Sequence, residues 1–333
     1  MIALNWGLVG TSKISHDFHS AIVANYTDLH HQVLAVASRT KRRAELFAKE
    51  HNIVKAYDNY EDLANNESIE VVYIGSSSFL HYELCKIMIN SGKHVLCEAP
   101  IGLTFSQVDE LLKLSDLKNV VLMTGLWSRF FPAYSFLEEL LRCENLGEVK
   151  DVYVKIGHKI EDKNKITDKK IAGGVTYSMV YTALQFILFV YREFPKTIRA
   201  QGKINQFGID MYVEVDLIFS NGRTATLICS GIETIRSQAN IIGKKGVLIF
   251  PTFESPTNAI FGTHKQIEWP FFEVKTPFFF KNRQGLRYEA DELWKCIKQK
   301  RFYSEAVPNQ DVIDLAKIVD EIRKQLAINL NGL

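Results

Sequence analysis

Residues 4–14 read Leu-Asn-Trp-Gly-Leu-Val-Gly-Thr-Ser-Lys-Ile, an apolar run that leads into a glycine-containing turn. Similar runs, rich in β-branched residues, recur at Val33–Ala37, Val71–Ile74, His94–Cys97 and Val120–Met123. Amphipathic segments with helical spacing separate these runs, at Arg42–Glu50, Leu80–Asn90 and Phe105–Leu117. Strands that are buried on both faces and alternate with helices are typical of a parallel, doubly wound sheet. The sequence therefore predicts a Rossmann-type α/β domain over residues 1–125.

The turn at residues 7–14 is the first candidate for ligand binding. Gly7 and Gly10 stand where the first strand would pass into the first helix, which Ser12, Lys13 and Ile14 would open. Backbone amides and the positive end of the helix dipole at such a turn suit a pyrophosphate. The spacing is Gly-x-x-Gly-x-Ser rather than Gly-x-Gly-x-x-Gly, so an ordinary structural turn is the alternative. These five residues are predicted to bind a dinucleotide.

Basic residues follow the second predicted strand. This strand ends in Ser38-Arg39-Thr40, and Arg43 follows closely. A site for NAD normally places an acidic residue there to bind the ribose 2′-hydroxyl, whereas arginine suits the 2′-phosphate of NADP. A basic helix start on the surface is the alternative. We therefore expect Ser38, Arg39 and Arg43 to bind the cofactor, and NADP to be preferred over NAD.

The ends of two later strands carry further polar residues. The run that ends at Ile74 continues as Gly75-Ser-Ser-Ser78, and the next run ends in Cys97-Glu98-Ala99-Pro100. In an open parallel sheet these carboxyl ends face the ligand crevice. Ser76 and Glu98 are therefore predicted cofactor contacts, although a serine-rich turn can also form without a ligand.

The pattern changes after residue 125. Helical patterns occupy four segments, Tyr134–Leu141, Gly173–Tyr191, Tyr288–Lys298 and Asp311–Leu326. Strand patterns occupy four others, Glu148–Ile156, Met211–Phe219, Thr224–Ser230 and Val247–Phe250. Asn221-Gly222 and Gly243–Gly246 separate successive strands and predict tight turns, and the lysine-rich segment Lys155–Lys170 predicts a surface loop. Residues 126–333 are thus predicted to form an α+β domain with a mostly antiparallel sheet.

Composition narrows the class of protein. The chain has 333 residues, 47% of them hydrophobic and 23% charged, with a net charge of +2. This is ordinary globular composition, and so small a net charge argues against nucleic acid or an anionic membrane as a partner. The five cysteines are widely spaced without a Cys-x-x-Cys pair, which favours a reducing compartment over a disulfide framework or a zinc site. With no signal-peptide pattern at its start, the chain is expected to be cytoplasmic, with no metal and no membrane association.

Several short motifs, taken in order, carry a family resemblance. In the first part of the chain they are Leu4-Asn-Trp-Gly7, Val36-Ala-Ser-Arg39, Lys55-Ala-Tyr57, Gly92-Lys-His-Val-Leu-Cys-Glu98 and Trp127-Ser-Arg-Phe-Phe-Pro-Ala133. Later they are Leu146-Gly147, Gly173-Gly174, Gln185-Phe186, Gly208-Ile-Asp210, Gly243-Lys-Lys-Gly246 and Tyr288-Glu-Ala290. By these motifs the chain resembles the glucose–fructose oxidoreductase/inositol dehydrogenase (Gfo/Idh/MocA) family, most strongly its branch of dimeric dihydrodiol and NADP-dependent D-xylose dehydrogenases.

The resemblance has consequences for fold and function. It implies a Rossmann domain followed by a domain with an open, mostly antiparallel sheet, through which a homodimer forms. It also implies hydride transfer between NADP and a sugar or diol. His81 would line the cofactor pocket, and Trp127, Arg129 and Phe280 would line the substrate cleft.

The catalytic positions depart from the family pattern. In the family a lysine follows the glutamate that ends the fifth strand, and an aspartate and a histidine or tyrosine four residues later stand on the helix after Gly-Gly. These positions are Ala99, Ser178 and Thr182 here. Alanine cannot carry a proton, and a serine or threonine hydroxyl would need its own base. The usual acid/base group, which typically contributes about 10²–10⁴-fold, is therefore missing.

The candidate substitutes are Tyr177, Tyr181, His81 and Lys13, and each has a structural alternative. Tyr181 is displaced by about 100° around an α-helix from the family position, and both tyrosines suit packing roles. His81 suits helix capping, and Lys13 suits a phosphate contact. Three hypotheses stay open: an NADP-dependent dehydrogenase with a rearranged acid/base group, a dinucleotide-binding pseudoenzyme, and a structural protein that need not bind a cofactor.

Overall fold

The computed structural model describes residues 3–24, 28–168, 171–262, 265–274 and 276–328. The chain forms two compact units. The first comprises residues 1–102, 106–130 and 271–309, and the second comprises residues 103–105, 131–270 and 310–333. The predicted division has a single boundary after residue 125, whereas residues 271–309 fold with the first unit.

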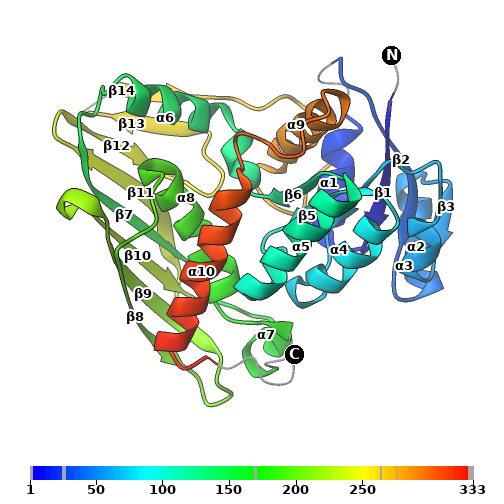
Figure 1. Ribbon diagram of the computed structural model, residues 1–333, viewed down its shortest axis with the longest axis horizontal. Coiled ribbons are helices and arrows are strands. Elements are labelled where there is room, and N and C mark those ends of the chain that lie inside the picture. The colour runs from blue at the N-terminus through cyan, green and yellow to red at the C-terminus, as the bar shows by residue number, and fades with distance from the viewer. Residues whose placement is uncertain (1–2, 25–27, 169–170, 263–264, 275, 329–333) are drawn as a thin grey trace. The chain divides into compact units, whose positions relative to one another are not determined.

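The first unit is built on a six-stranded parallel sheet in the order β3-β2-β1-β4-β5-β6 (Figure 1). Its strands are β1 (Leu4–Val9), β2 (His31–Ala37), β3 (Lys55–Tyr57), β4 (Val71–Ile74), β5 (His94–Glu98) and β6 (Leu122–Gly125). Its main helices are α1 (Lys13–Ile22), α2 (Lys41–His51), α3 (Tyr60–Ala64), α4 (His81–Asn90), α5 (Phe105–Lys118) and α9 (Leu286–Lys298). The strand order reverses between β1 and β4, which is the switch point of a Rossmann sheet. The predicted fold of the N-terminal part is confirmed.

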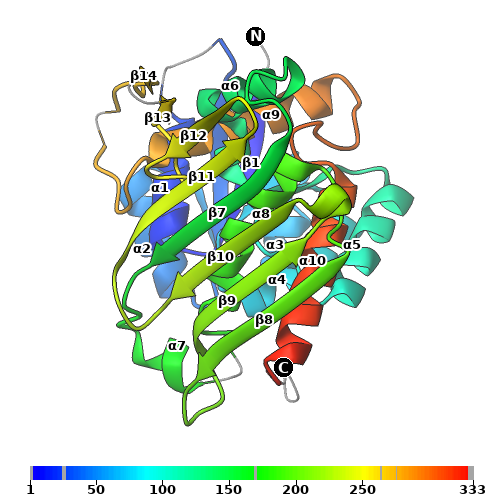
Figure 2. The same ribbon diagram turned by 90° about the vertical axis from the view of Figure 1, so that its left-hand side faces the viewer.

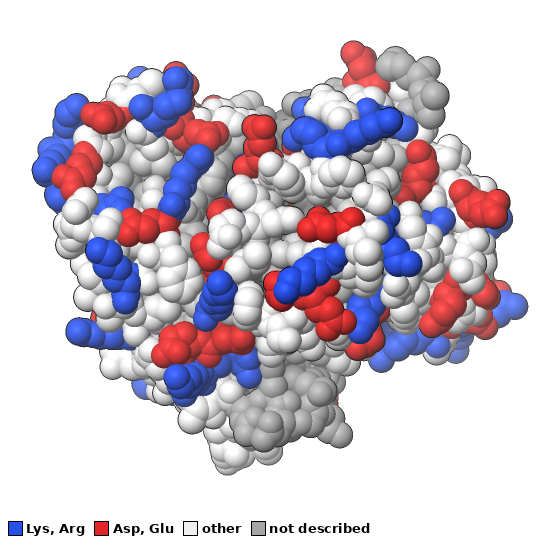
Figure 3. Space-filling model, viewed as in Figure 1, with Lys and Arg blue, Asp and Glu red and all other residues white. Residues whose placement is uncertain are grey.

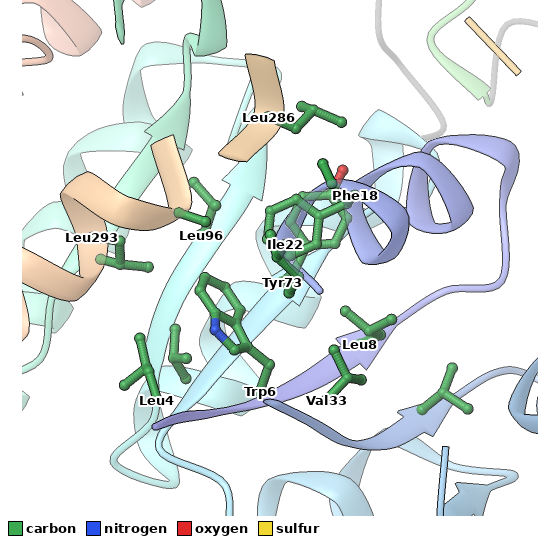
Figure 4. Packing of buried hydrophobic residues seen from close by; sticks show 14 of the residues in the cluster. Leu4, Trp6, Leu8, Phe18, Ile22, Val33, Tyr73, Leu96, Leu286 and Leu293 are labelled. Atoms are coloured by element: carbon green, nitrogen blue, oxygen red, sulfur yellow. The ribbon is translucent and has the colours of Figure 1, made fainter. Parts of the chain in front are cut away.

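The central strands β1 and β4 are buried on both faces, as their continuous apolar runs require. Trp6 of β1 lies against Phe18 of α1 with ring centroids 5.2 Å apart, and Phe18 stacks on Tyr73 of β4 at 3.7 Å. Leu286 and Leu293 of α9 belong to the same cluster (Figure 4). A helix from far along the chain therefore closes the core of the N-terminal sheet.

A buried arginine ties α9 to the loop after α1. The Arg287 guanidinium donates hydrogen bonds of 2.5–2.9 Å to three carbonyl oxygens, those of Ile22, Ala24 and Leu29. Its Nε donates to Asp291 at 2.7 Å, and Asp291 also lies 2.8 Å from His31 Nε2. The charge of Arg287 is thus compensated inside the unit, as a buried cation requires.

The second unit is built on an eight-stranded sheet in the order β14-β13-β12-β11-β7-β10-β9-β8 (Figure 2). Its strands are β7 (Val149–Gly157), β8 (Thr197–Ile204), β9 (Asp210–Ile218), β10 (Thr224–Ser230), β11 (Ile235–Gly243), β12 (Gly246–Phe250), β13 (Asn258–Phe261) and β14 (Lys265–Glu268). Its main helices are α6 (Pro132–Arg142), α8 (Tyr181–Tyr191) and α10 (Asn309–Gln325). Among the described strands of this second sheet, β7 and β10 are the one pair of neighbours that runs parallel. The predicted mostly antiparallel sheet is confirmed.

The predicted turns join the expected strands. Asn221 and Gly222 have φ values of 57° and 68°, the left-handed conformation that a two-residue hairpin favours, and they connect β9 to β10. Gly243 pairs with Gly246 where β11 turns into β12. The prediction of a loop over Lys155–Lys170 is wrong in part, because β7 continues to Gly157 and a short helix, α7, covers Lys163–Thr167. Asp162 caps α7 by accepting from the Asn164 amide at 3.0 Å, and residues 169–170 lie outside the described residues.

The long helix predicted from Gly173 begins later and irregularly. Thr176–Val180 form a π-helical turn, and α8 continues from it. Asp210 caps this turn, because its Oδ2 accepts from the amides of Val175 and Thr176 at 2.9 and 2.6 Å. Gly174 has a φ of 86°, and a Cβ there would lie 2.3 Å from the Asp210 carboxylate. Gly174 of the Gly-Gly motif and Asp210 of the Gly-x-Asp motif therefore act together, because the missing side chain at Gly174 lets the buried Asp210 carboxylate hold the start of the helix.

In the described part of the chain, the charged surface residues and the cysteines show no feature that points to a particular partner. Lysine and arginine are interspersed with aspartate and glutamate on the face that Figure 3 displays. No helix within the described ranges combines the length and the apolar character that crossing a membrane needs. All five cysteines are free, and only Cys143 is exposed.

Candidate cofactor and catalytic site

The glycine turn joins the carboxyl ends of β1 and β4. Gly10 has a φ of 103°, which strains any residue with a side chain, and a Cβ there would lie a tight 3.1 Å from the Gly75 carbonyl oxygen. Ser12 caps α1 by accepting from the Ser15 amide, and its hydroxyl donates to the Gly75 oxygen at 2.6 Å. The sequence thus places a bare backbone turn at the start of α1, beside the switch point.

Three other residues of this segment have different surroundings. A Cβ on Gly7 would lie 2.9 Å from Leu63, so this glycine allows close packing under β1. Ile14 packs against the hydrophobic cluster of the unit. Lys13 is exposed, with its Nζ 5.5 Å from the centroid of the Phe279 ring. Of these three residues, Lys13 alone presents a charge at the turn.

Two guanidinium groups stand beyond the end of β2. Ser38 is buried, and its amide donates to the Tyr57 carbonyl oxygen at 3.1 Å. Arg39 and Arg43 are exposed, and both lie near the Tyr60 hydroxyl: burial raises the pKa of Tyr60, and the two positive charges oppose that rise. No carboxylate among the described residues forms an ion pair with either arginine. The two charges are thus available together for an anion.

His81 and Ser76 lie where β4 and β5 end. His81 is buried, with Nδ1 2.8 Å from the Pro100 carbonyl oxygen and Nε2 3.0 Å from that of Ser76. Burial lowers its pKa, so the imidazole is a neutral brace between two loops and is poorly placed to exchange protons. The Ser76 hydroxyl is buried and has no protein partner. An unsatisfied buried hydroxyl costs free energy, so its place beside Gly10 suits a ligand atom.

A pair of carboxyl groups lies beyond the ends of β5 and β6. Tyr73 donates to Glu98 Oε1 at 2.6 Å, while both oxygens of Glu289 are buried without a hydrogen-bond partner. Burial raises the pKa of Glu289 well above its ordinary value, and the nearby charge of Glu98 raises it further. Burial also raises the pKa of Glu98, although Tyr73 and Arg283 oppose that change. Burial thus favours the protonated form of both carboxyl groups.

The predicted substrate-cleft residues do not all have the same character. The Arg283 guanidinium lies over the Trp127 ring at 4.2 Å and near the Phe280 ring at 5.3 Å, which brings Trp127 and Phe280 together. Phe280 is 44% exposed, as a ligand-lining aromatic side chain can be. Arg129 differs from them, because it is 3% exposed and donates to the Ala306 carbonyl oxygen at 3.3 Å.

At the two substituted catalytic positions of the second unit, Ser178 and Thr182, the hydroxyls bond to nearby backbone carbonyl oxygens. Ser178 Oγ lies 3.2 Å from the Gly174 carbonyl oxygen, and Thr182 Oγ1 donates to the Ser178 carbonyl oxygen at 2.8 Å. The Tyr177 hydroxyl donates to the Leu103 carbonyl oxygen at 3.0 Å, and burial raises the pKa of this hydroxyl above its ordinary value. Tyr181 is 3% exposed. Among the contacts described, the hydroxyls of Ser178, Thr182 and Tyr177 bond to backbone carbonyl oxygens and to no carboxylate or imidazole base.

The residues of the first unit fit a dinucleotide. Gly10 and the start of α1 would hold the pyrophosphate, Ser76 would use its unpartnered hydroxyl, and Arg39 with Arg43 would face an anionic group. When bound, a nicotinamide dinucleotide supplies a ring that accepts or gives a hydride. The chain itself contributes positioning and charge.

Sequence reasoning missed Glu289, Tyr73 and Arg283. Tyr73 lies inside an apolar strand and Arg283 in an irregular segment, so no pattern marks them. Glu289 carries a signal, because it stands three residues after Leu286 and four before Leu293, on the apolar stripe of α9. An acidic residue on a core-facing stripe indicates a functional or ion-paired role.

Comparisons with known proteins find relatives along the whole chain. Residues 4–126 match the model of an oxidoreductase family with an NAD-binding Rossmann fold, and residues 134–249 match the GFO/IDH/MocA C-terminal domain. A trans-1,2-dihydrobenzene-1,2-diol dehydrogenase of Xenopus tropicalis is 33% identical over 330 residues, which cover 98% of this chain and 99% of the relative.

Two solved structures share the fold. A levoglucosan dehydrogenase in complex with NADH and levoglucosan has a TM-score of 0.84 at 17% identity, covering 98% of both chains. An aldose–aldose oxidoreductase from Caulobacter crescentus, complexed with glycerol, has a TM-score of 0.83 at 20% identity and the same coverage. With both family models matched and a full-length relative above 30% identity, the chain belongs to the GFO/IDH/MocA family of oxidoreductases.

Proposed function

We propose that this chain is an NADP(H)-binding member of its family in which the usual dehydrogenation is lost or strongly slowed. Cofactor binding rests on the bare turn at Gly10, the unpartnered hydroxyl of Ser76 and the two charges of Arg39 and Arg43. The family description itself specifies an NAD-binding Rossmann fold.

One observation carries the catalytic part of the proposal. The hydroxyls of Ser178 and Thr182 both bond to carbonyl oxygens of their own helix, and Ala99 has no group that can titrate. A hydroxyl that serves the helix backbone and has no base beside it is poorly suited to take a proton from an alcohol. Loss of this proton transfer alone would lower the rate by about 10²–10⁴-fold.

A second candidate function is an active NADP-dependent dehydrogenase of a sugar or vicinal diol. The Glu98–Glu289 pair favours it, because burial raises the pKa of both carboxyl groups, as is common for side chains that act as an acid or base. The relatives named trans-1,2-dihydrobenzene-1,2-diol dehydrogenase suggest the substrate class.

Two assays on the purified chain separate these candidates. NADPH binding would be followed by fluorescence, and NADP reduction would be measured with D-xylose and with trans-1,2-dihydrobenzene-1,2-diol. Binding without turnover supports the proposal. Turnover that Glu289→Gln abolishes, with NADPH affinity unchanged, would establish the second candidate instead. Failure of the folded chain to bind NADPH would overturn both and favour a purely structural role.

The preference for NADP is tested by reversing one charge. Arg39→Asp is expected to weaken NADPH binding by about 10–100-fold, because a charge-assisted contact of roughly 1.5–3 kcal/mol is lost and replaced by repulsion. NADH affinity should change little, so the preference disappears. Arg42→Asp, at an exposed neighbouring position, is the matched control. Equal affinities of the unchanged chain for NADPH and NADH would rule out the 2′-phosphate interpretation.

We also propose that the chain forms a homodimer through its eight-stranded sheet. α8 lies on one face of this sheet, while Figure 2 shows no helix in front of the other face. That second face carries half-buried side chains such as Tyr153, Tyr212 and Ile228, which alternate with fully buried residues. Light scattering should give twice the chain mass of 38.1 kDa, and a mass of one chain would contradict the dimer.

A further inference from the structure

Three imidazoles and a carboxylate gather between α1 and α2 of the first unit. His16 and His19 project from α1, while Glu50 and His51 end α2. The rings of His16 and His51 are 4.8 Å apart, and those of His19 and His51 are 4.4 Å apart. None of these residues belongs to the cofactor and catalytic site described above, so the cluster needs an explanation of its own.

Three ligand atoms of this cluster converge on one point. His16 Nδ1 lies 3.2 Å from His51 Nε2 and 3.4 Å from Glu50 Oε1, and the last two atoms are 4.0 Å apart. Ligands on a tetrahedral Zn²⁺ ion, with bonds of about 2.0–2.2 Å, stand roughly 3.3–3.5 Å from one another. The observed separations are therefore close to those of three corners of such a site.

The surroundings orient the two ligating rings. His16 Nε2 lies 3.2 Å from the Pro277 carbonyl oxygen, so a proton on Nε2 leaves the lone pair of Nδ1 directed at the cluster. A backbone carbonyl behind a histidine is the usual second partner of a metal-bound imidazole. Phe279 packs against His16 with ring centroids 4.7 Å apart, and Phe47 packs against His51 at 4.3 Å. Both rings are thus fixed before any ion arrives.

The exposures of the three side chains suit an ion that enters from solvent. The side chains of His16 and His51 are 11% and 5% exposed, whereas that of Glu50 is 60% exposed. A carboxylate at the rim would compensate part of the charge of a divalent cation.

From this geometry we propose that His16, Glu50 and His51 bind a divalent transition-metal ion, with Zn²⁺ as the best match. Two imidazoles and one carboxylate are ligands that Zn²⁺ accepts, and water from the exposed side would complete four-coordination. The widely spaced cysteines predicted no zinc site, and this site uses none of them. It is independent of the proposed cofactor function.

The ion would join three parts of the unit. α1 supplies His16, α2 supplies Glu50 and His51, and the segment around Pro277 supports His16 from behind. The same segment is already held to α1, because Asp17 accepts from the amides of Phe279 and Phe280 at 2.8 and 3.0 Å. Binding would therefore stabilise the unit against unfolding, since the ion binds the folded chain in preference to the unfolded one.

The test uses the full chain without a histidine tag, freed of metal by a chelator. Titration with Co²⁺ should produce the visible absorption of a tetrahedral ion, Zn²⁺ should displace it at one equivalent, and the melting temperature should rise with Zn²⁺. His51→Gln should weaken Zn²⁺ binding by at least about 100-fold, because even the loss of an outer partner costs about 10–100-fold. His30→Gln, at an exposed histidine outside the cluster, should bind like the unchanged chain.

A second variant guards against misfolding. Glu50 is exposed, so Glu50→Gln should leave the metal-free melting temperature unchanged while still weakening Zn²⁺ binding. Failure of the unchanged chain to take up Co²⁺ or Zn²⁺ would overturn the proposal. Equal Zn²⁺ affinity in Glu50→Gln and His30→Gln would also overturn it, because the ion would then be bound elsewhere.

Discussion

A chain that carries Ala99→Lys, Ser178→Asp and Thr182→Tyr together is expected to reduce NADP in the presence of D-xylose or a vicinal diol at least about 100-fold faster than the unchanged chain. The three changes restore the groups that the family pattern places at these positions. Hydride transfer from an alcohol needs a base for the hydroxyl proton, and the present side chains supply none. Initial rates of NADPH formation, measured by absorbance, give the comparison.

The structure indicates that these positions can accept larger side chains. Ser178 is exposed on its helical turn and Thr182 is half-exposed, so aspartate and tyrosine need not enter the core. Each hydroxyl that is removed bonds only to the helix backbone among the contacts described, so the helix keeps its own ladder. Single replacements should gain much less, because in the family pattern the three groups belong to one acid/base set, and the effects of such groups are not additive.

The matched control introduces side chains of similar size that cannot exchange a proton. Ala99→Met, Ser178→Asn and Thr182→Phe together introduce side chains of similar size that do not titrate near neutral pH. This control should show no gain in rate. If the restored chain folds and binds NADPH but is no faster than the control, the substrate cleft itself must have diverged from the dehydrogenase pattern.

Arg287→Met is expected to destabilise the first unit by about 3–5 kcal/mol at pH 7. The substitution fills a similar volume, but it removes the hydrogen bonds of Arg287 to the Asp291 carboxylate and to three carbonyl oxygens. Urea unfolding, followed by tryptophan fluorescence, gives the change. Arg301→Met is the control, because Arg301 pairs with Glu292 at a half-exposed position and should contribute about 0–1 kcal/mol.

The loss of stability caused by Arg287→Met should be smaller in mild acid. Burial lowers the pKa of His31 below 6.5, and the charge of Arg287 lowers it further, so the unchanged chain loses stability as the pH falls through 6.5. Without Arg287, His31 can protonate and pair with Asp291, which lies 2.8 Å away. The difference between the two proteins should therefore be smaller at about pH 5.5 than at about pH 7.5. An equal difference at both values would mean that His31 does not respond to Arg287.

The fold was largely predictable because, in most elements, the local sequence pattern favours the same structure that the folded chain adopts. β4 reads as a buried strand, and it is buried throughout. Asn221-Gly222 marks a hairpin, because few other pairs adopt its backbone conformation without strain. The π-helical turn at Thr176–Val180 could not be predicted, since it depends on Asp210, a residue far away in sequence. The same holds for α9, whose membership of the first unit is decided by tertiary packing.

The candidate site was predictable only where a motif carries the information. The glycine turn and Arg39 stand at positions that the βαβ pattern fixes. The spacing of Glu289 from Leu286 and Leu293 marks a buried acid, but it does not reveal the nearby Glu98. The cluster of His16 with His51 joins segments that are distant in sequence, so spacing gives no signal for it. The residue types at the catalytic positions show from the sequence which groups are missing. Only the structure shows that the hydroxyls of Ser178 and Thr182 bond to the backbone of their own helical segment.

The return of residues 271–309 to the first unit has a consequence for biosynthesis. When residues 1–130 have left the ribosome, the cluster around Trp6 still lacks Leu286 and Leu293, so its apolar surface stays open. Most of the second unit's sheet is synthesised before α9 and can assemble meanwhile. The first unit is therefore expected to finish folding only near the end of translation, and a nascent chain stalled before α9 would be a natural client of chaperones.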